Sequence, residues 1–485
     1  MNFFPNVIPV LPEIYVAFMI IVILLTDAFM PKSKLSFSIA QVTLIGALIL
    51  QLWVYAHVNG YMQLTFNRMF ILDNLAQGTK TFTYLLGIVT LVYIRQYIAD
   101  KKLLQGEFYA IFLFAVLGMQ VMISANNMLV LYVGLELLSL ALYGLVALQR
   151  DKVRATEAAM KFFILGALAS GILLYGISFI YGASGGKLEL SQIVSAMSIM
   201  NGQNTALFTF GVVFIVAGLA FKLGLVPFHM WVPDVYEGSP LAVTTIIGTL
   251  TKIAAVVFVL RFLIGGLILS SQSWSVMLGI VAILSVGLGN IIAISQTNIK
   301  RLLGYSAVAH MGFVAFALMT VTRSGLVATL FYTLSYAITA LAGFGVLLLL
   351  SKGEHECENI NDLKGLSKTH PVYAGIMLLV MFSMAGIPPL IGFYAKFKVL
   401  EALIAVGFIK TAVFAVVMSL IAAFYYLRIV KVMYFDEPAP QTDAVSCANN
   451  CLFTRVVLFL NGAILVILGI LPNGLFSYCV RLLGG

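Results

Sequence analysis

Long apolar runs recur from one end of this chain to the other, and they constrain its fold more than any other feature. Each run has roughly 18 to 25 mainly apolar residues, the length at which a helix crosses a bilayer with its own backbone hydrogen bonds satisfied. With 61% hydrophobic and only 10% charged residues in a chain of 485, nothing is left for a soluble domain. The sequence therefore predicts an all-α polytopic membrane protein with fourteen spans, at 8–29, 37–57, 81–99, 107–124, 128–148, 157–181, 206–226, 240–262, 276–296, 301–321, 325–350, 372–404, 410–434 and 454–475.

The composition also excludes several classes of function. The formal net charge is +9, but the lysines and arginines are dispersed among apolar runs, whereas a nucleic-acid-binding face requires them to cluster. There is no P-loop, no GxGxxG that opens a helix and no CxxCH haem motif. The chain is therefore predicted to bind no nucleic acid, cofactor or metal. Its four cysteines are expected to be incidental thiols: Cys357, Cys447, Cys451 and Cys479.

Charges in the loops predict the orientation. Most lysines and arginines between the runs fall on one side if both termini lie outside, which the positive-inside rule favours. On this assignment Lys80 and Arg261 are outer loop residues, and the semi-polar segment 61–77 is a loop or an interfacial helix. Five lysines remain within predicted spans and need a separate explanation: Lys161, Lys222, Lys252, Lys396 and Lys398.

Two of the spans are predicted to be broken helices. Pro227 follows Lys222, and Pro388 and Pro389 precede Lys396. Proline interrupts a helix, and broken backbone inside a membrane is tolerated only where protein or water surrounds it.

Each broken helix is the fourth of a set of five, and five is odd, so the second set would cross the membrane inverted. The predicted organisation is three N-terminal spans (1–106), a first five-helix repeat (107–262), a second, inverted repeat (276–434) and a C-terminal span (454–485).

Polar side chains recur at helical spacing inside the apolar runs. Tyr132, Glu136, Ser139 and Tyr143 share one face of the fifth span. A buried lysine titrates within reach of neutral pH, so it can pass a proton to a neighbour. The candidate proton-transfer residues are Glu136, Lys161, Lys222, Lys252, His310 and Lys396.

A structural interpretation stays open beside the functional one. Each lysine could be neutral, or paired once and inert. Lys161 lies one turn after Glu157, so the two could form a simple ion pair, although Glu136 is an alternative partner. His229 and His310 could each ligate a metal, but no second histidine or carboxylate stands at ligand spacing.

Several of these stretches resemble one known family. They surround Glu136, Lys161, Lys222, His310 and Lys396, and read YVGLELLSLALYGLVAL, RATEAAMKFFILGALASG, FKLGLVPFHMWVPDVYEGSP, SQTNIKRLLGYSAVAHMGF and MAGIPPLIGFYAKFKVL. Together they resemble the subunit N family of bacterial NADH:quinone oxidoreductase, respiratory complex I. Single motifs among them are shared with the related subunits L and M and with multisubunit cation/proton antiporters.

The resemblance implies a fourteen-helix proton-translocating subunit in the bacterial inner membrane, and the loop charges then predict that both termini are periplasmic. Its partners would be antiporter-like subunit M and the small membrane subunits. NADH, FMN, iron–sulfur clusters and quinone would belong to the assembled complex and not to this subunit. The family's proton-transfer positions match Glu136, Lys161, Lys222, Lys252 and Lys396. A cation/proton antiporter subunit and a membrane scaffold that transports nothing remain as alternatives.

Overall fold

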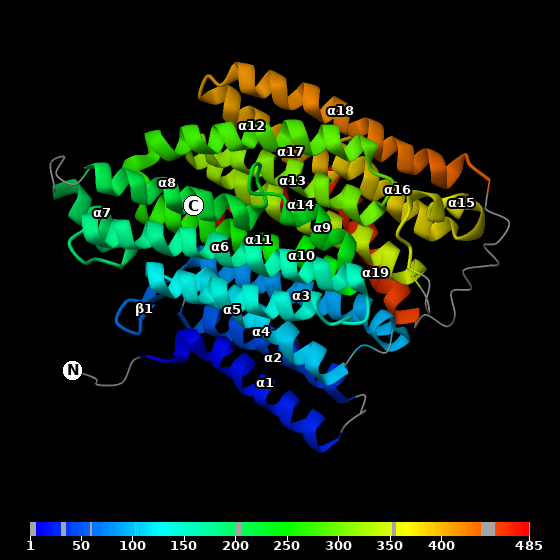
Figure 1. Ribbon diagram of the computed structural model, residues 1–485, viewed down its shortest axis with the longest axis horizontal. Helices are drawn as coiled ribbons and strands as arrows, with labels where there is room; N and C mark the ends of the chain where they lie inside the picture. Colours follow the sequence, from blue (N-terminus) through cyan, green and yellow to red (C-terminus); the bar gives the residue numbers. More distant parts are fainter. Residues whose placement is uncertain are drawn as a thin grey trace.

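The chain folds into a bundle of long helices, seen here in a computed structural model that describes residues 6–30, 35–58, 61–101, 103, 105–199, 205–351, 356–437 and 452–484 (Figure 1). Cys447 and Cys451 lie outside the described residues. The elements are α1 (Leu11–Phe29), α2 (Leu35–Val58), β1 (Gln63–Thr65), β2 (Phe70–Leu72), α3 (Asn74–Asp100), α4 (Gln105–Ser124), α5 (Met128–Val146), α6 (Val153–Ala183), α7 (Leu190–Ile199), α8 (Thr205–Leu223), α9 (Trp231–Gly238), α10 (Leu241–Gly248), α11 (Leu250–Leu260), α12 (Ser271–Ser295), α13 (Ile299–Leu318), α14 (Arg323–Leu350), α15 (Leu366–Thr369), α16 (Pro371–Ala385), α17 (Ile391–Ala405), α18 (Ile409–Tyr434), α19 (Leu452–Ile470) and α20 (Asn473–Leu482).

The predicted spans are present. Within the described residues, thirteen helices are long and apolar enough to cross a membrane, and each matches one predicted span. The remaining span, 372–404, is the broken pair α16 and α17. One interruption was not predicted: the span 240–262 contains two helices, α10 and α11, because the backbone leaves helical geometry at Thr249 (φ −122°, ψ −79°).

The segment 61–77 is neither a loop nor an interfacial helix, so that prediction was wrong. Strands β1 and β2 form an antiparallel hairpin in which Gln63 pairs with Leu72. Helix α3 then begins at Asn74, because the carboxylate of Asp73 accepts a hydrogen bond from the backbone N–H of Ala76 (2.8 Å) and caps the first turn.

Both described ends of the chain lie at the same end of the bundle. The hydroxyl of Thr65 in the hairpin donates to the carbonyl of Asn6 (2.7 Å). At the other terminus, the guanidinium of Arg323 at the start of α14 donates to the carbonyl of Gly484 (2.7 Å). Asn74 beside the hairpin reaches the carbonyl of Arg481 (3.5 Å). We call this end of the bundle the N-terminal face and the opposite end the far face.

The two broken helices end their first halves in the same way. Gly224 (φ +79°) follows α8 and Gly386 (φ +86°) follows α16, and both have the left-handed backbone that glycine adopts without strain. In each case the amide of the residue after the glycine turns back toward the helix. Leu225 N–H donates to the carbonyl of Ala220 (2.8 Å), and Ile387 N–H donates to the carbonyl of Phe382 (2.9 Å). The prolines Pro227, Pro388 and Pro389 lie in the gaps that follow.

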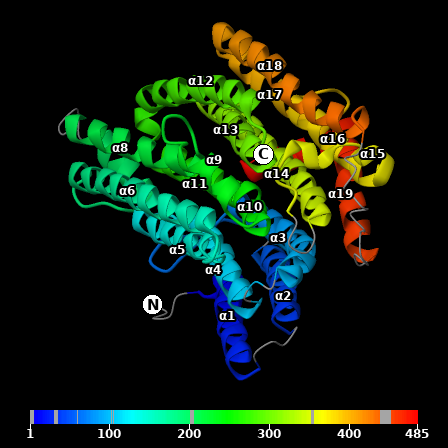
Figure 2. The same cartoon turned by 45° about the vertical axis from the view of Figure 1, so that its right-hand side comes forward.

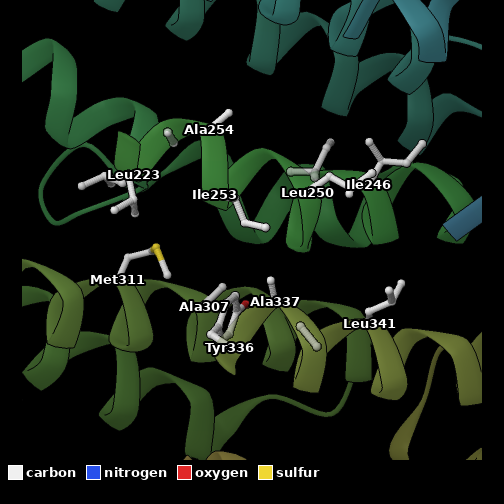
Figure 3. Packing of buried hydrophobic residues seen from close by; sticks show 14 of the residues in the cluster. Leu223, Ile246, Leu250, Ile253, Ala254, Ala307, Met311, Tyr336, Ala337 and Leu341 are labelled. Carbon is white, nitrogen blue, oxygen red and sulfur yellow. The ribbon is translucent and has the colours of Figure 1, made fainter. Parts of the chain in front are cut away.

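The helices pack around an apolar interior. Helices α1 and α2 lie at one edge of the bundle and α18 at the opposite edge in both views (Figures 1 and 2). Between them, α10 and α11 face α13 and α14 across a layer of buried apolar side chains (Figure 3). That layer includes Leu223, Ile246, Leu250, Ile253 and Ala254 on one side, and Ala307, Met311, Tyr336, Ala337 and Leu341 on the other.

Candidate functional site

The polar stripe of α5 lines a cavity inside the helix bundle. Glu136, Ser139 and Tyr143 all face this cavity, together with Ser170 on α6 and Lys222 on α8. The hydroxyl of Ser170 donates to the Glu136 carboxylate and also contacts the Tyr132 hydroxyl (3.1 Å). The predicted stripe therefore surrounds one site, at which a carboxylate is held in place by hydroxyl groups.

Lys222 reaches the same cavity from the end of α8. Its ammonium donates to the Ser139 hydroxyl (3.2 Å), and its charge interacts with that of Glu136. Gly218 lines the cavity one turn earlier, and a Cβ there would lie 2.8 Å from the Cβ of Leu173, so this glycine lets α8 approach α6 closely. A carboxylate and an ammonium thus line the same cavity.

Lys252 caps the first helix break. It is 2% exposed on α11, and its ammonium donates to the carbonyl of Leu223 (3.1 Å), the last residue of α8. It also lies 5.7 Å from the ring centroid of Trp231. Carbonyls at a helix end have no partner within the helix and attract a positive charge. Lys252 supplies that charge and lies close enough to Lys222 for the two to repel each other.

Lys396 caps the second break in the same manner. Its ammonium donates to the carbonyl of Ala385 (3.0 Å), the last residue of α16, and lies 5.4 Å from the ring centroid of Phe313. His310 on α13 interacts electrostatically with it. The two breaks therefore carry equivalent groups, Lys252 at one and Lys396 at the other.

His310 is part of a hydrogen-bonded chain. Its Nδ1 lies 2.8 Å from the Tyr332 hydroxyl and its Nε2 lies 3.1 Å from that of Tyr426. Tyr426 in turn lies 2.5 Å from the Ser306 hydroxyl. His310 also lines a small cavity that extends to Gly392 beside the second break. The geometry suits a group that exchanges protons between neighbours on both ring nitrogens.

Lys161 lies apart from the cavity of Glu136. Its side chain is 44% exposed and pairs with Glu157 (2.8 Å) and with Asp234 on α9 (2.9 Å). Asp234 also accepts from Arg301 at the start of α13 (2.8 Å), which in turn pairs with Glu237 (2.9 Å). Of the two partners that the sequence leaves open for Lys161, the structure has Glu157, and it adds Asp234.

Two residues assigned to the outer side as loop charges are instead buried, so their placement in loops was wrong. Lys80 is 0% exposed inside α3 and pairs with Glu13 of α1. Arg261 is 8% exposed at the end of α11 and forms two hydrogen bonds to Asp73 (2.6 and 2.7 Å). Both lie near helix ends, where a charge carries little weight in a hydropathy pattern, and both have partners distant in the sequence.

Sequence reasoning also missed Ser170, Trp231 and Asp234. Ser170 follows Gly166 by one turn on α6, and both line the cavity, so this small and polar stripe was a usable signal. Trp231 and Asp234 lie on the short helix after the first break, where no periodicity is long enough to predict a face. Within the described ranges, no group of three or more His, Cys, Asp or Glu side chains is arranged to hold a metal ion.

Known proteins are similar to this chain over its whole length. A family profile described as NADH:quinone oxidoreductase/Mrp antiporter, TM, matches residues 125–422. NADH-quinone oxidoreductase subunit N of Laribacter hongkongensis (strain HLHK9) is 50% identical over 482 residues, which cover 98% of this chain and 97% of the relative. Subunit N of Neisseria gonorrhoeae (strain ATCC 700825 / FA 1090) is 48% identical over 482 residues, with 99% and 98% covered.

Solved structures agree with this fold. A chain of respiratory complex I from Thermus thermophilus with bound Aureothin superposes with a TM-score of 0.79 at 29% identity, covering 96% of this chain and 98% of that one. A chain of the Mrp complex from Dietzia sp. DQ12-45-1b gives a TM-score of 0.84 at 21% identity, covering 97% and 96%, and supports the fold alone. The chain therefore belongs to the NADH:quinone oxidoreductase/Mrp antiporter family of membrane proteins, and its full-length relatives in that family are subunits N.

Proposed function

We propose that this chain is the proton-translocating membrane subunit N of an NADH:quinone oxidoreductase. The observation that carries this proposal is the set of ionisable groups within the bundle: Lys252 and Lys396 are buried at the two helix breaks, and Glu136 and Lys222 line a cavity beside the first break. A charged lysine at the centre of a bilayer costs about 2.5 to 3.5 kcal/mol on insertion scales, so several such residues in one chain indicate a function that requires them. Subunit N relatives that match the full length support the same assignment.

The proposed proton-transfer groups fall into two sets. In the first, Glu136, Lys222 and Lys252 follow one another from the α5 cavity to the first break. In the second, His310 and Lys396 lie at the second break. Protons would move by way of these groups and internal water, with lysines alternating between charged and neutral forms. Lys161 would act at the far-face end, where Asp234 holds it.

The driving reaction would take place elsewhere in the complex. NADH, FMN, iron–sulfur clusters and quinone belong to other subunits in this proposal, and this chain contributes proton transfer. Its partners would be antiporter-like subunit M and the small membrane subunits, within the bacterial inner membrane. The N-terminal face, which carries both termini, would be periplasmic.

The organisation of the chain in this proposal has two five-helix units, residues 107–262 and 276–434, in inverted orientation. The opposite directions of the two broken helices support it. Helix α7 lies at the N-terminal face, because Glu189 beside it bridges to Asn127 at the start of α5, so α8 enters from that face. Helix α16 follows a loop that bridges to Asn298 at the far face, and it therefore enters from the other side.

The test is proton translocation by the intact complex. The complex is reconstituted in liposomes, NADH and a soluble quinone are added, and proton movement is followed with a pH-sensitive dye. Lys222→Met and Glu136→Gln are expected to reduce the protons moved per NADH oxidised, because each removes one member of the cavity pair. Lys398→Met is the matched control, since Lys398 forms a pair with Glu401 outside both sets (2.7 Å).

Two outcomes would contradict the proposal. Unchanged proton movement in both cavity variants would leave the buried groups with a structural role. Proton exchange by the purified subunit alone, driven by a sodium or potassium gradient and independent of NADH, would identify a cation/proton antiporter.

A further inference from the structure

One buried ion pair, Lys80 with Glu13, lies outside both sets of proposed proton-transfer groups. Lys80 on α3 forms an ion pair with Glu13 in the first turn of α1. The two side chains are 0% and 5% exposed, respectively. The Lys80 ammonium also lies 4.6 Å from the ring centroid of Phe70 in the hairpin that covers this end of α3. Fully buried lysines are rare, and within a membrane protein such a residue points to a function by default.

Further polar groups lie along the helix face that carries Lys80. Asp73, Gln77, Lys80 and Tyr84 recur at the spacing of one helix face along α3. Three groups on or beside this face are buried and have no hydrogen-bond partner among the residues that the structure describes: the side-chain amide of Gln77, the Tyr84 hydroxyl and Oε2 of Glu13. Buried polar groups in proteins are almost always satisfied by protein or by ordered water. Water that reaches these groups would also reach the free oxygen of Glu13.

The pair is coupled electrically to the helix that carries Lys252. The charge of Lys80 interacts with those of Asp73 and Arg261, and Arg261 terminates α11. Burial raises the pKa of the Asp73 carboxyl, but the charge and hydrogen bonds of Arg261 lower it further, so this group stays ionised. Arginine holds its proton at any accessible pH. Arg261 therefore interacts electrostatically with Lys80 but does not transfer a proton.

We propose that Glu13 and Lys80 form a further proton-holding site at the N-terminal face, a role that rests on the proposed function. A proton moves from the Lys80 ammonium to the Glu13 carboxylate, so that one N–H bond breaks, one O–H bond forms and the pair becomes neutral. The unpartnered Glu13 oxygen then exchanges that proton with water at this face. Among the described titratable or charged groups, Asp73 and Arg261 act on Lys80, and Tyr84 interacts with Glu13.

The decisive variant is the double replacement Glu13→Gln with Lys80→Met in the assembled complex. It removes both charges together, whereas a single replacement would leave one buried charge unpaired. We expect normal assembly and normal quinone reduction, with the protons moved per NADH reduced several-fold. Lys398→Met with Glu401→Gln is the control, because it removes a more exposed pair of the same kind and should leave proton movement unchanged.

A second measurement covers the case in which the double variant fails to assemble. Infrared difference spectra of the otherwise unmodified complex, recorded between two pH values, should contain the carbonyl stretch of a protonated carboxyl group that shifts when Glu13 is replaced by aspartate. Absence of that shift, or normal proton movement in the double variant, would overturn the proton-holding role. If Lys222→Met also moves protons normally, the proposed function fails as well; if Lys222→Met is defective, only this inference fails.

Discussion

Replacing Lys222 by arginine separates a proton-transfer role from a structural one. The arginine keeps a positive charge in the cavity opposite Glu136 and can still donate to the Ser139 hydroxyl, which Lys222 reaches at 3.2 Å. Reference pKa values of arginine exceed that of lysine by at least about 2 units, so the deprotonated fraction falls by at least about 100-fold. We therefore expect a complex that assembles and reduces quinone but moves far fewer protons.

The measurement is NADH-driven proton uptake by inverted membrane vesicles, followed with a pH-sensitive dye and divided by the rate of NADH oxidation. The amount of assembled complex is measured in the same vesicles, so that a loss of protein is not mistaken for a loss of transfer. Lys398→Arg serves as the matched substitution outside the cavity. Full proton uptake by the Lys222→Arg variant would refute the reasoning, because a residue that cannot give up its proton would then suffice.

Other consequences of the structure are open to direct measurement. Glu136→Gln should keep the hydrogen bond from Ser170 but abolish the charge opposite Lys222, so proton uptake should fall while quinone reduction continues; equal losses of both would contradict this. Lys252→Met and Lys396→Met should each lower the melting temperature of the complex as well as proton uptake, because each removes a charged hydrogen bond to a helix end, worth about 1.5 to 3 kcal/mol. Gly386→Ala should destabilise the protein by about 1 to 2 kcal/mol, since its φ of +86° is strained for alanine and a Cβ would lie 2.9 Å from the Lys396 side chain. Gly375→Ala, in open space on α16, should be neutral or stabilising, and equal melting temperatures for the two glycine variants would count against the strain.

The spans and the polar stripe of α5 could be predicted because both are local properties of the sequence. An apolar run long enough to cross a bilayer has few alternatives to a membrane helix, and thirteen predicted spans match single membrane-length helices or, for 240–262, a pair of helices end to end. Glu136 and Ser139 lie on one face simply because helical geometry places them there. The same logic fails at Thr249, where the backbone leaves helical geometry within a segment whose residues all read as helix.

The buried ion pairs could not be predicted because their partners are far apart in the sequence. Lys80 and Glu13 are separated by 67 positions, and Arg261 and Asp73 by 188. Hydropathy treats each of these residues as a polar interruption near a helix end, which is why Lys80 and Arg261 were assigned to loops. Only the tertiary fold, which brings Glu13 beside Lys80 and packs α11 against α3, turns these isolated charges into neutral pairs that an apolar interior can accommodate.

The structure also changes which lysines should be compared. From the sequence alone, Lys222 and Lys396 are the equivalent lysines of the two repeats, since each lies within a few residues of a proline break. A break leaves carbonyls at the end of its first half without partners, and the group that satisfies them can come from any helix that passes close by. At the second break this group is Lys396, from the helix half that follows; at the first it is Lys252, from α11. Lys222 makes no such contact in the described part of the chain and instead donates to Ser139. The mutations that should have equivalent effects at the two breaks are therefore those of Lys252 and Lys396. Lys222 lies instead between the first break and Glu136, in the cavity that both residues line.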